Sequence, residues 1–320
     1  MKKKQLNWGI LSTARINRAL IPPLQVSKRS RLMAVASRQL ETAEAFARER
    51  SIPRAYGSYE ALLADPEIDV IYNPLPNDLH AEWTVKSLQA GKHVLCEKPL
   101  ALTLEEMDRI EAASRESGCI AAEAFMYRHH PQTLLVKRLV DEGQLGRLQY
   151  VRGSYSYTFT RTGNYRADPA RGGGSLWDVG CYPISYARLL IGSEPLEFFA
   201  RQVIGPGGYE ESFYGQMTFP SGVIAQIDSG FASPLRTQIE VVGTEGWLRV
   251  PMPYKPARGD KLLLTRGDST ELIRPPHREL YIGEVEDIES AVLDGLPQRL
   301  PLSESRLNLT AILNLIASSR

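Results

Sequence analysis

The sequence predicts an α/β domain with a doubly wound parallel sheet, followed by an α+β domain built on a largely antiparallel, open-faced sheet. Over the first 125 residues, short apolar runs alternate with helical patterns, which is typical of parallel sheets. From about residue 148 the apolar residues recur with period two between turn sequences, as in antiparallel strands. The length of 320 residues, 43% of them hydrophobic, exceeds what one small core requires. We therefore place the domain boundary between residues 125 and 126.

Helix start and stop residues define the elements of the first domain. Pro22 and Pro23 are expected to stop or kink the first helix, since proline donates no backbone hydrogen bond. Ser58 and Thr103 are candidate amino-terminal caps, and Gly91 is a helix stop. The expected strands cover residues 6–11, 32–36, 69–73, 93–96 and 119–124, and the expected helices cover residues 15–21, 42–50, 59–64, a segment ending near 90, and 103–118.

Hairpin patterns define the second domain. Residues 213–219 and 223–231 alternate with period two and flank a Pro-Ser-Gly turn. With few helices expected, this sheet would keep one face uncovered, which favours self-association as a homodimer. The other expected strands cover residues 148–159, 238–242, 247–250, 262–265 and 271–273, and the expected helices cover residues 283–293 and 303–318.

Charge and cysteine content exclude several classes of protein. The net charge of +1 predicts no attraction to nucleic acid or to an anionic membrane. No run approaches the roughly 20 apolar residues of a membrane helix. The three cysteines, Cys96, Cys119 and Cys181, have neither a disulfide pattern nor zinc-ligand spacing. We therefore expect no metal site and a reducing, cytoplasmic compartment.

The first strand–turn–helix segment is the candidate nucleotide-binding loop. A dinucleotide-binding loop of the G-x-G-x-x-G type would place glycines at positions 12, 14 and 17, where this chain has Ser12, Ala14 and Asn17. Small residues still let the backbone approach a pyrophosphate, and the amino end of a helix binds anions. Taken alone, the segment fits an ordinary strand–helix turn equally well. The candidate cofactor-binding residues here are Gly9, Ser12, Thr13, Ala14, Arg15 and Ile16.

Ser37 and Arg38 follow the second expected strand, where NAD-binding folds place a carboxylate for the ribose 2′-hydroxyl. An arginine instead attracts a 2′-phosphate bidentately, and a serine adds a hydroxyl donor. The pair therefore predicts NADP in preference to NAD. The alternative is that Arg38 is a solvated residue at the start of a helix.

Five motifs, in the same order, resemble the Gfo/Idh/MocA oxidoreductases, the family of glucose–fructose oxidoreductase and inositol dehydrogenase. The motifs are GILSTARI at 9–16, NPLPNDLH at 73–80, AGKHVLCEKP at 90–99, EAFMYR at 123–128 and GGGSLWDVGCY at 172–182. The resemblance implies a dinucleotide-binding Rossmann domain over residues 1–125 and a substrate-binding and oligomerisation domain over residues 126–320. It also implies hydride transfer between nicotinamide and a carbinol or carbonyl carbon. The missing glycines at 12, 14 and 17 depart from the family pattern.

The resemblance assigns the candidate catalytic residues. Asp178 and the residue four positions later form the family's catalytic pair. Tyrosine at 182 resembles the branch of dimeric dihydrodiol dehydrogenase, NADP-dependent xylose dehydrogenase and glucose–fructose oxidoreductase. Tyr182 would be the general acid and base, and Lys98 would lower its pKa or polarise the substrate oxygen. Asp178 would orient the lysine or bind a second substrate hydroxyl. Gly180 and Pro183 indicate a helix break or a first turn at this point.

Further residues complete the candidate site. Lys98 precedes a proline, which favours an extended backbone and presents the lysine outward from the strand end. Residues after the third parallel strand would line the nicotinamide, although His80 could instead cap the next helix. The candidate cofactor contacts are Pro74, Leu75, Asn77, His80, Glu97 and Lys98, and the candidate substrate contacts are Arg128, Tyr165, Arg166 and Asp178.

The sequence therefore favours an NADP-dependent oxidoreductase that acts on a sugar, a polyol or a trans-dihydrodiol. One alternative is a ketoreductase acting on a nucleotide-linked keto-sugar. Another is a non-catalytic NADP-binding sensor on the same scaffold. The joint presence of Lys98, Asp178 and Tyr182 argues against a sensor, because a sensor needs no proton donor.

Overall fold

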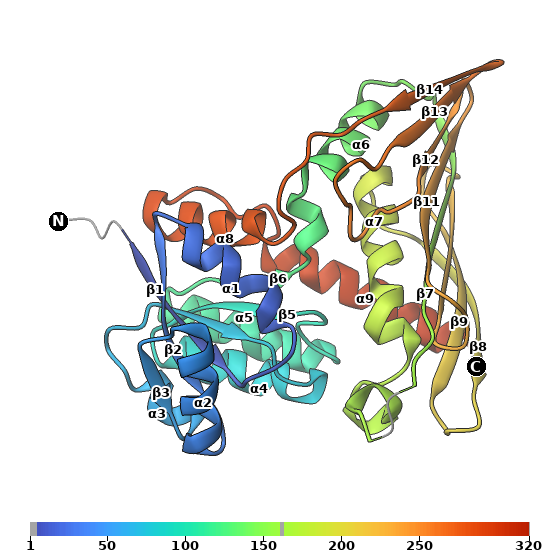
Figure 1. Ribbon diagram of the computed structural model, residues 1–320. Helices are drawn as coiled ribbons and strands as arrows, with labels where there is room; N and C mark the ends of the chain where they lie inside the picture. Colours follow the sequence, from blue (N-terminus) through green and yellow to red (C-terminus); the bar gives the residue numbers. More distant parts are fainter. Residues whose placement is uncertain (1–4, 161–162, 320) are drawn as a thin grey trace. The chain divides into compact units, whose positions relative to one another are not determined.

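The computed structural model describes residues 5–160 and 163–319, and the chain divides into two units. Unit 1 comprises Met1–Met126 and Tyr281–Arg306, and unit 2 comprises Tyr127–Leu280 and Leu307–Arg320. The chain therefore leaves unit 1 near residue 126 and returns to it for residues 281–306 (Figure 1).

Six parallel strands form the sheet of unit 1, in the order β3-β2-β1-β4-β5-β6. This confirms the predicted doubly wound sheet and adds the short edge strand β3, which the sequence pattern did not indicate. The strands are β1 (Leu6–Leu11), β2 (Ser30–Ala36), β3 (Arg54–Tyr56), β4 (Val70–Asn73), β5 (His93–Glu97) and β6 (Ala121–Ala124).

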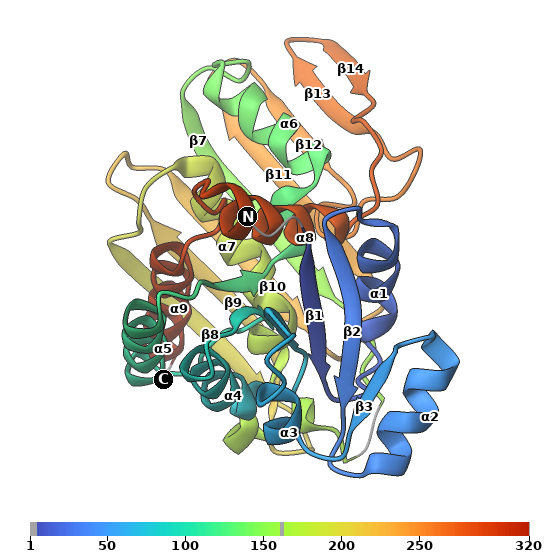
Figure 2. The same ribbon diagram turned by 90° about the vertical axis from the view of Figure 1, so that its left-hand side faces the viewer.

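Helices cover both faces of this sheet (Figure 2). Side chains of α1, α2 and α8 pack with Trp8 and Tyr72 in one core, whereas α3 and α4 pack with Ile71 in the other. Neighbouring residues of β4 thus point to opposite faces, as expected for a strand buried on both sides. The helices are α1 (Asn17–Val26), α2 (Leu40–Arg50), α3 (Tyr59–Leu63), α4 (Asn77–Gln89), α5 (Leu104–Ser117) and α8 (Ile282–Glu289), which continues into a π-helical turn (Ser290–Asp294).

Helix α1 runs through Pro22 and Pro23 and ends at Val26, so of the predicted stop or kink at these prolines the stop is wrong. Each proline removes one backbone donor from the helix interior. The buried side chains of Leu20 and Leu24 pack into the core of unit 1. This packing outweighs the lost hydrogen bonds, because most helical stability in proteins comes from the buried face.

The predicted caps of α3 and α5 are confirmed. Ser58 Oγ accepts a hydrogen bond from the Ala61 N–H at 3.1 Å. Thr103 Oγ1 accepts one from the Glu106 N–H at 3.1 Å. The carboxylate of Glu106 turns back as in a capping box, but it accepts from the Leu102 N–H at 2.8 Å, one residue before the cap.

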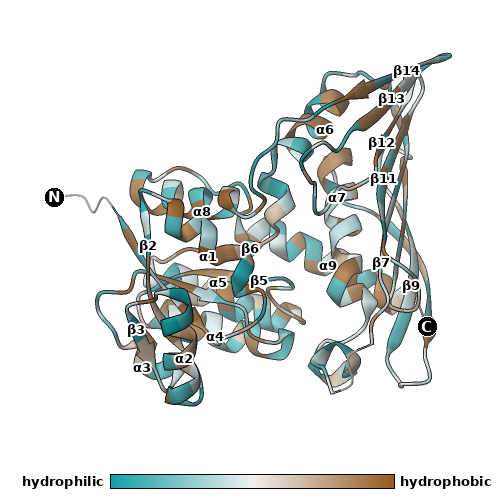
Figure 3. Cartoon of the chain, viewed as in Figure 1, coloured by the Kyte–Doolittle hydropathy of each residue, from teal (hydrophilic) through white to brown (hydrophobic). Residues whose placement is uncertain are grey.

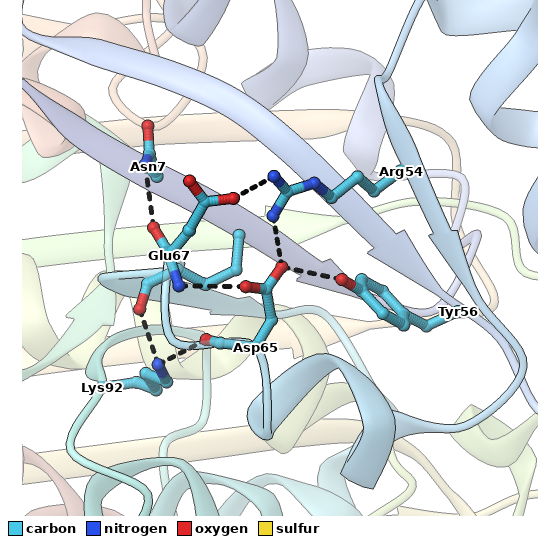
Figure 4. A network of polar contacts seen from close by, with 7 residues as sticks. Asn7, Arg54, Tyr56, Asp65, Glu67 and Lys92 are labelled. Carbon is cyan, nitrogen blue, oxygen red and sulfur yellow. Dashed lines mark hydrogen bonds and ion pairs between the residues drawn. The ribbon is translucent and has the colours of Figure 1, made fainter.

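A buried lysine ties together the segments that precede β4 and β5 (Figure 4). Lys92 Nζ donates to the carbonyls of Asp65 and Ile68 at 2.7 and 2.8 Å. The Asp65 carboxylate accepts from Tyr56 Oη and Arg54 Nη1, each at 2.7 Å. This network fixes the amino ends of the strands, so it stabilises the edge of the sheet opposite the candidate site.

Unit 2 is built on an eight-stranded sheet in the order β14-β13-β12-β11-β7-β10-β9-β8. The β7–β10 pair is parallel and the other pairs are antiparallel, which confirms the predicted largely antiparallel sheet. The strands are β7 (Leu148–Ser156), β8 (Glu197–Ile204), β9 (Glu210–Thr218), β10 (Ile224–Gly230), β11 (Arg236–Gly243), β12 (Trp247–Val250), β13 (Leu262–Arg266) and β14 (Ser269–Ile273).

Helices lie on one face of this sheet (Figure 1). They are α6 (Pro131–Asp141), α7 (Cys181–Ile191) and the part of α9 (Leu302–Ser318) that belongs to unit 2. A Cβ added at Gly153 of β7 would lie 2.6 Å from Pro183 Cβ, so this glycine allows α7 to approach the strand closely. Within the described part of unit 2, the opposite face of the sheet has no helix over it.

Every helix in the described segments mixes hydrophobic and hydrophilic residues or is short, and none is long and apolar enough to cross a membrane. Figure 3 shows this mixture on α8, for example, where hydrophobic and hydrophilic turns alternate. The buried residues of α8 include Val285 and Ile288, which belong to the core of unit 1. Its apolar face is therefore explained by packing inside that unit.

Candidate active site

The carboxyl ends of the unit 1 strands bring the predicted cofactor residues to one edge of the sheet. β1 leads to β2 on one side and β4 leads to β5 on the other, so the β1–β4 boundary is a topological switch point. Open α/β sheets bind their ligands at such a point. The predicted residues follow β1 (12–16), β2 (37 and 38), β4 (74–80) and β5 (97 and 98), and of these Pro74, Leu75, Asn77 and His80 are buried.

Ser12 and Asn17 shape the turn after β1. Ser12 has a φ of +75°, in the left-handed region that favours glycine. The buried side-chain amide of Asn17 donates to the Ser12 carbonyl at 3.0 Å, and the Ala14 N–H donates to Ser12 Oγ at 3.3 Å. These two bonds hold a serine in the conformation that a glycine adopts without such help.

The same turn is electrostatically suited to an anion. The first turn of α1 contains no acidic residue, and Arg15 and Arg18 are exposed beside it. The first N–H groups of a helix have no intrahelical acceptor and favour negative charge. The residues present therefore fit the pyrophosphate of a dinucleotide, although the three expected glycines are missing.

Gly9 lies within β1 rather than in the turn. A Cβ added there would lie 2.8 Å from Leu62 Cδ2 of α3. The close packing of α3 on β1 thus explains this glycine, and its predicted role in cofactor binding stays a prediction.

Ser37 and Arg38 directly follow β2. Ser37 is half-buried, and its N–H donates to the Tyr56 carbonyl at 3.0 Å. Arg38 is exposed and forms no ion pair with any residue that the structure describes. Arg54, in contrast, is paired with Asp65 at 2.7 Å. A guanidinium that is not held in an ion pair fits a 2′-phosphate.

His80 joins two of the loops at this edge. Its Nδ1 lies 2.7 Å from the Pro99 carbonyl after β5, and its Nε2 lies 2.6 Å from the Leu75 carbonyl after β4. Burial lowers the pKa of His80 to about 4, so at pH 7 the neutral ring donates through one nitrogen. Asn73 supports the arrangement by donating to the His80 carbonyl at 3.1 Å. His80 lies inside α4, and its ring does not cap that helix.

Lys98 follows β5 and is half-buried. The preceding Glu97 is held by Tyr72, whose hydroxyl donates to Glu97 Oε1 at 2.7 Å. Burial and the Glu97 charge raise the pKa of Tyr72 well above its ordinary value, so the hydroxyl remains a donor. Two residues after Lys98, the Leu100 N–H donates to Glu123 Oε1 of β6 at 3.0 Å. Glu97, directly before the lysine, and Leu100, two residues after it, are thus both held by hydrogen bonds to residues of the sheet.

In unit 2 the carboxylate of Asp178 is bound from two sides. Tyr157 Oη donates to Oδ2 at 2.7 Å, and Arg166 Nε donates to Oδ1 at 2.8 Å. Arg166 Cζ also lies 4.6 Å from the centre of the Tyr165 ring. Burial and the Asp178 charge raise the pKa of Tyr157, which keeps its hydroxyl protonated. The structure therefore brings together Asp178, Tyr165 and Arg166, as well as Tyr157, which the sequence analysis missed.

Tyr182 is the second residue of α7, and Asp178 lies in a π-helical turn (Leu176–Gly180) directly before it. Pro183 lies in the first turn of α7, one of the two arrangements that the sequence allowed. The π-helical turn changes the angular spacing of side chains. The i, i+4 rule of an α-helix therefore does not apply between Asp178 and Tyr182.

A group of tyrosines surrounds Tyr182, which is 6% exposed. Its ring centre lies 5.5 Å from those of Tyr155 and Tyr254, and 5.7 Å from that of Tyr127. Tyr127 Oη also donates to the Tyr182 carbonyl at 3.3 Å. These contacts fix the ring of Tyr182 in one orientation within unit 2.

Arg128 is bound to α7. Its Nη1 donates to Ser185 Oγ at 2.8 Å, and the residue is buried. Its predicted contact with substrate or phosphate stays a prediction.

The sequence analysis missed three polar side chains that hold the predicted ones: Asn73, Glu123 and Tyr157. Glu123 interrupts an apolar strand and Asn73 ends one, and buried polar residues of this kind are a usable signal. Tyr157 gave no such signal, because it continues an alternating run of serine and tyrosine. Among the residues with described positions, no three His, Cys, Asp or Glu side chains form a group that could hold a metal ion.

A doubly wound parallel sheet with its switch point between β1 and β4 is typical of dinucleotide-binding oxidoreductases. Residues 6–125 match the oxidoreductase family with the NAD-binding Rossmann fold, and residues 133–249 match the GFO/IDH/MocA C-terminal domain. The chain belongs to the GFO/IDH/MocA family of oxidoreductases, as the five motifs indicated.

Similar proteins support this assignment. D-xylose 1-dehydrogenase (NADP(+)) 2 of Haloferax volcanii is 36% identical, over 93% of this chain and 92% of that protein. Trans-1,2-dihydrobenzene-1,2-diol dehydrogenase of Danio rerio is 33% identical, over 96% of this chain and 94% of that protein. The crystal structure of KijD10, a 3-ketoreductase from Actinomadura kijaniata in complex with NADP and TDP-benzene, has a TM-score of 0.92 at 29% identity and covers 99% of this chain and 98% of that one. These proteins fit the branch that tyrosine at 182 indicated.

Proposed function

We propose that the protein is an NADP-dependent oxidoreductase that transfers a hydride between nicotinamide and a carbinol or carbonyl carbon of a sugar, polyol or trans-dihydrodiol. Its relatives are named for xylose and for a dihydrobenzenediol. The main support is the joint presence of Lys98 at the end of β5 and of Asp178 and Tyr182 in unit 2. A hydride-transfer enzyme needs such groups because a proton must move when the hydride moves.

Each proposed catalytic residue has one role. The bound nicotinamide supplies or accepts the hydride. Tyr182 gives or takes the proton, and the Lys98 ammonium polarises the substrate oxygen. Asp178, oriented by Tyr157 and Arg166, accepts a hydrogen bond from a second substrate hydroxyl.

Substitution of the catalytic residues tests this proposal. Lys98→Met and Tyr182→Phe should each lower turnover by about a hundredfold or more, the effect of losing an acid–base group. Titration of NADPH fluorescence should show that the cofactor still binds. Lys86→Met, which removes a half-buried lysine paired with Glu82, is the matched control and should keep full activity. Unchanged turnover in both variants would remove the catalytic assignment.

The preference for NADP is proposed to come from Ser37 and Arg38. Arg38→Ala should weaken NADP binding by about tenfold or more and leave NAD binding unchanged, because only NADP carries the 2′-phosphate. Arg48→Ala, at an exposed position on α2, is the control. An equal loss for both cofactors would contradict the role of Arg38.

A second candidate is reduction of a nucleotide-linked keto-sugar. The observation in its favour is the similarity to KijD10, a 3-ketoreductase whose structure contains TDP-benzene. Steady-state rates on free aldoses and on a TDP-linked keto-sugar separate the two candidates. The sensor hypothesis is not favoured, because the relatives are named as dehydrogenases and reductases.

We also propose that two copies associate through the open face of the unit 2 sheet. This face exposes Phe199 and Tyr214, which are 62% and 52% exposed, around a hollow of about 300 Å³. Arg201 and Asp228 lie beside them, so a second copy can match the patch with both apolar and charged groups. Sedimentation of the wild-type protein should show a dimer, and Phe199→Glu should convert it to a monomer. Val26→Glu, at an exposed position in unit 1, is the control and should remain a dimer. A wild-type monomer at micromolar concentration would disprove this.

The cytoplasm is the proposed location. Cys96, Cys119 and Cys181 are all buried and free, which suits a reducing compartment. Cell fractionation with an antibody against the protein tests this, and recovery from an extracytoplasmic fraction would contradict it.

A further inference from the structure

Two buried side chains hold the backbone that follows Lys98. The Pro99 carbonyl lies 2.7 Å from His80 Nδ1, and the Leu100 N–H donates to Glu123 Oε1 at 3.0 Å. His80 and Glu123 are only 1% and 4% exposed, so water does not replace these bonds when they break. An unsatisfied buried polar group costs about 1–3 kcal/mol. The two peptide groups after the lysine therefore have one strongly preferred position.

The two supports come from both sides of β5. His80 belongs to α4, which follows the neighbouring strand β4, and Glu123 belongs to β6, the other neighbour. The His80 ring also lies against the Leu75 carbonyl after β4, and a neutral ring that donates to Pro99 through Nδ1 packs against this second carbonyl without a hydrogen bond to it. Any shift of this ring would move both loops together.

Glu123 also interacts electrostatically with Lys98. Burial raises the pKa of Glu123 to about 7, while the bond from the Leu100 N–H and the Lys98 charge act in the opposite direction. Glu304 is the other charge that acts on this carboxyl. The interaction is mutual, so an ionised Glu123 favours the ammonium form of Lys98. Neither role of Glu123 requires contact with substrate or cofactor.

We propose that His80 and Glu123 are positioning residues for Lys98, which hold Pro99 and Leu100 and so fix the direction in which the lysine side chain leaves the strand. This inference rests on the catalytic role proposed for Lys98. It assigns a function to two titratable groups that are buried in unit 1 and that the reaction itself does not consume.

A double-mutant cycle tests the proposal in the full-length protein. Glu123→Ala and His80→Ala should each lower kcat by about tenfold, since small displacements of a catalytic group have effects of this size or larger. In the Lys98→Met background, neither substitution should lower the residual rate further, because the residue that they position is absent. Glu123→Gln keeps an oxygen for the Leu100 N–H and should retain turnover within about threefold of the wild type.

A second measurement does not depend on activity. The rate of Lys98 acetylation by acetic anhydride at pH 8, quantified by mass spectrometry, reports how much free amine is present. Glu123→Gln should raise this rate severalfold, because the lost carboxylate no longer favours the ammonium form. Glu289→Gln is the matched control, since Glu289 is an equally buried carboxyl of unit 1 that is bonded to Ser27 instead. It should leave the rate unchanged.

The outcomes separate the inference from the function on which it rests. Equal losses of turnover in the wild-type and Lys98→Met backgrounds would show that His80 and Glu123 are merely structural. An unchanged Lys98 labelling rate in Glu123→Gln would overturn the electrostatic action of Glu123 on Lys98. Unchanged turnover in Lys98→Met alone would instead remove the catalytic role of the lysine, and the labelling experiment would still decide whether Glu123 acts on it.

Discussion

The buried pair of His80 and Glu123 should give the protein two opposite pH dependences of stability. Burial raises the pKa of Glu123 from an ordinary value of 4.5 to about 7, so between these values the folded protein holds a proton that the unfolded chain has lost. The contribution of Glu123 is therefore present below pH 4.5 and is lost as the pH rises to 7. Over this interval the free energy of unfolding should fall by about 3 kcal/mol, at about 1.4 kcal/mol per pKa unit.

The contribution of His80 to the free energy of unfolding depends on pH in the opposite direction. Burial lowers its pKa from 6.5 to about 4, so between pH 6.5 and 4 the unfolded chain binds a proton that the folded protein does not. The stability contribution of His80 is present above pH 6.5 and is lost as the pH falls to 4, again by about 3 kcal/mol. Between pH 4.5 and 6.5 the two effects largely cancel in the wild type.

Urea unfolding at several pH values measures both effects. The wild-type free energy of unfolding minus that of Glu123→Gln should decrease from pH 4.5 to 7, and the same difference for His80→Gln should increase from pH 4 to 6.5. Taking differences removes the contributions of all other titrating groups. A difference that stays constant with pH in either variant would refute the burial argument for that residue, and two slopes of the same sign would refute the assignment as a whole.

Three further substitutions test other parts of the fold and site. Tyr157→Phe removes one of the two bonds to Asp178 and should lower turnover about tenfold without changing NADP affinity, as measured by steady-state kinetics and fluorescence titration. Gly153→Ala places a methyl group 2.6 Å from Pro183 and should destabilise the protein by about 1–3 kcal/mol in thermal unfolding; an unchanged Tm would contradict the close approach. Lys92→Met removes the hydrogen bonds to the Asp65 and Ile68 carbonyls, of which the Asp65 carbonyl keeps only a 3.3 Å bond from the Ile68 N–H, and should cost about 1–3 kcal/mol in urea, while turnover of the folded enzyme is unaffected.

The fold of unit 1 was largely predictable because its signals are local. Caps such as Ser58 and Thr103 and apolar runs between them depend on a few neighbouring residues, and they correctly located most strands and helices. The passage of α1 through Pro22 and Pro23 was not predictable in this way. It depends on core packing contributed by other segments of the chain.

In unit 2, the periodicity of hydrophobic residues did not identify every helix and strand. Helix α7 is buried on nearly all sides and contains Pro183, so its sequence lacks the amphipathic pattern that identifies a surface helix. In strand β8 the exposed positions include the apolar residues Phe199, Val203 and Ile204. Hydrophobicity therefore does not distinguish the two faces of this strand. The sequence allowed a first helical turn at Pro183 without giving the extent of α7, and it did not indicate β8.

The candidate site was predictable only where motifs mark it. Lys98, Asp178 and Tyr182 were identified from such motifs, and their roles await the experiments above. The residues that hold these side chains or the backbone next to them could not be identified from the sequence. Tyr157 lies 21 positions from Asp178 and Glu123 lies 23 positions from Leu100, so only the folded chain shows that they are partners.

The return of residues 281–306 to unit 1 has a consequence for synthesis on the ribosome. Val285 and Ile288 of α8 complete the core that contains Trp8 and Tyr72, yet they are translated only after the 154 residues of Tyr127–Leu280. At about 5–20 residues per second, the nascent amino-terminal sheet waits roughly eight to thirty seconds for its last covering helix. During that interval its apolar face is open to chaperones or to aggregation. Truncation before residue 281 should therefore yield an insoluble fragment rather than an independent cofactor-binding domain.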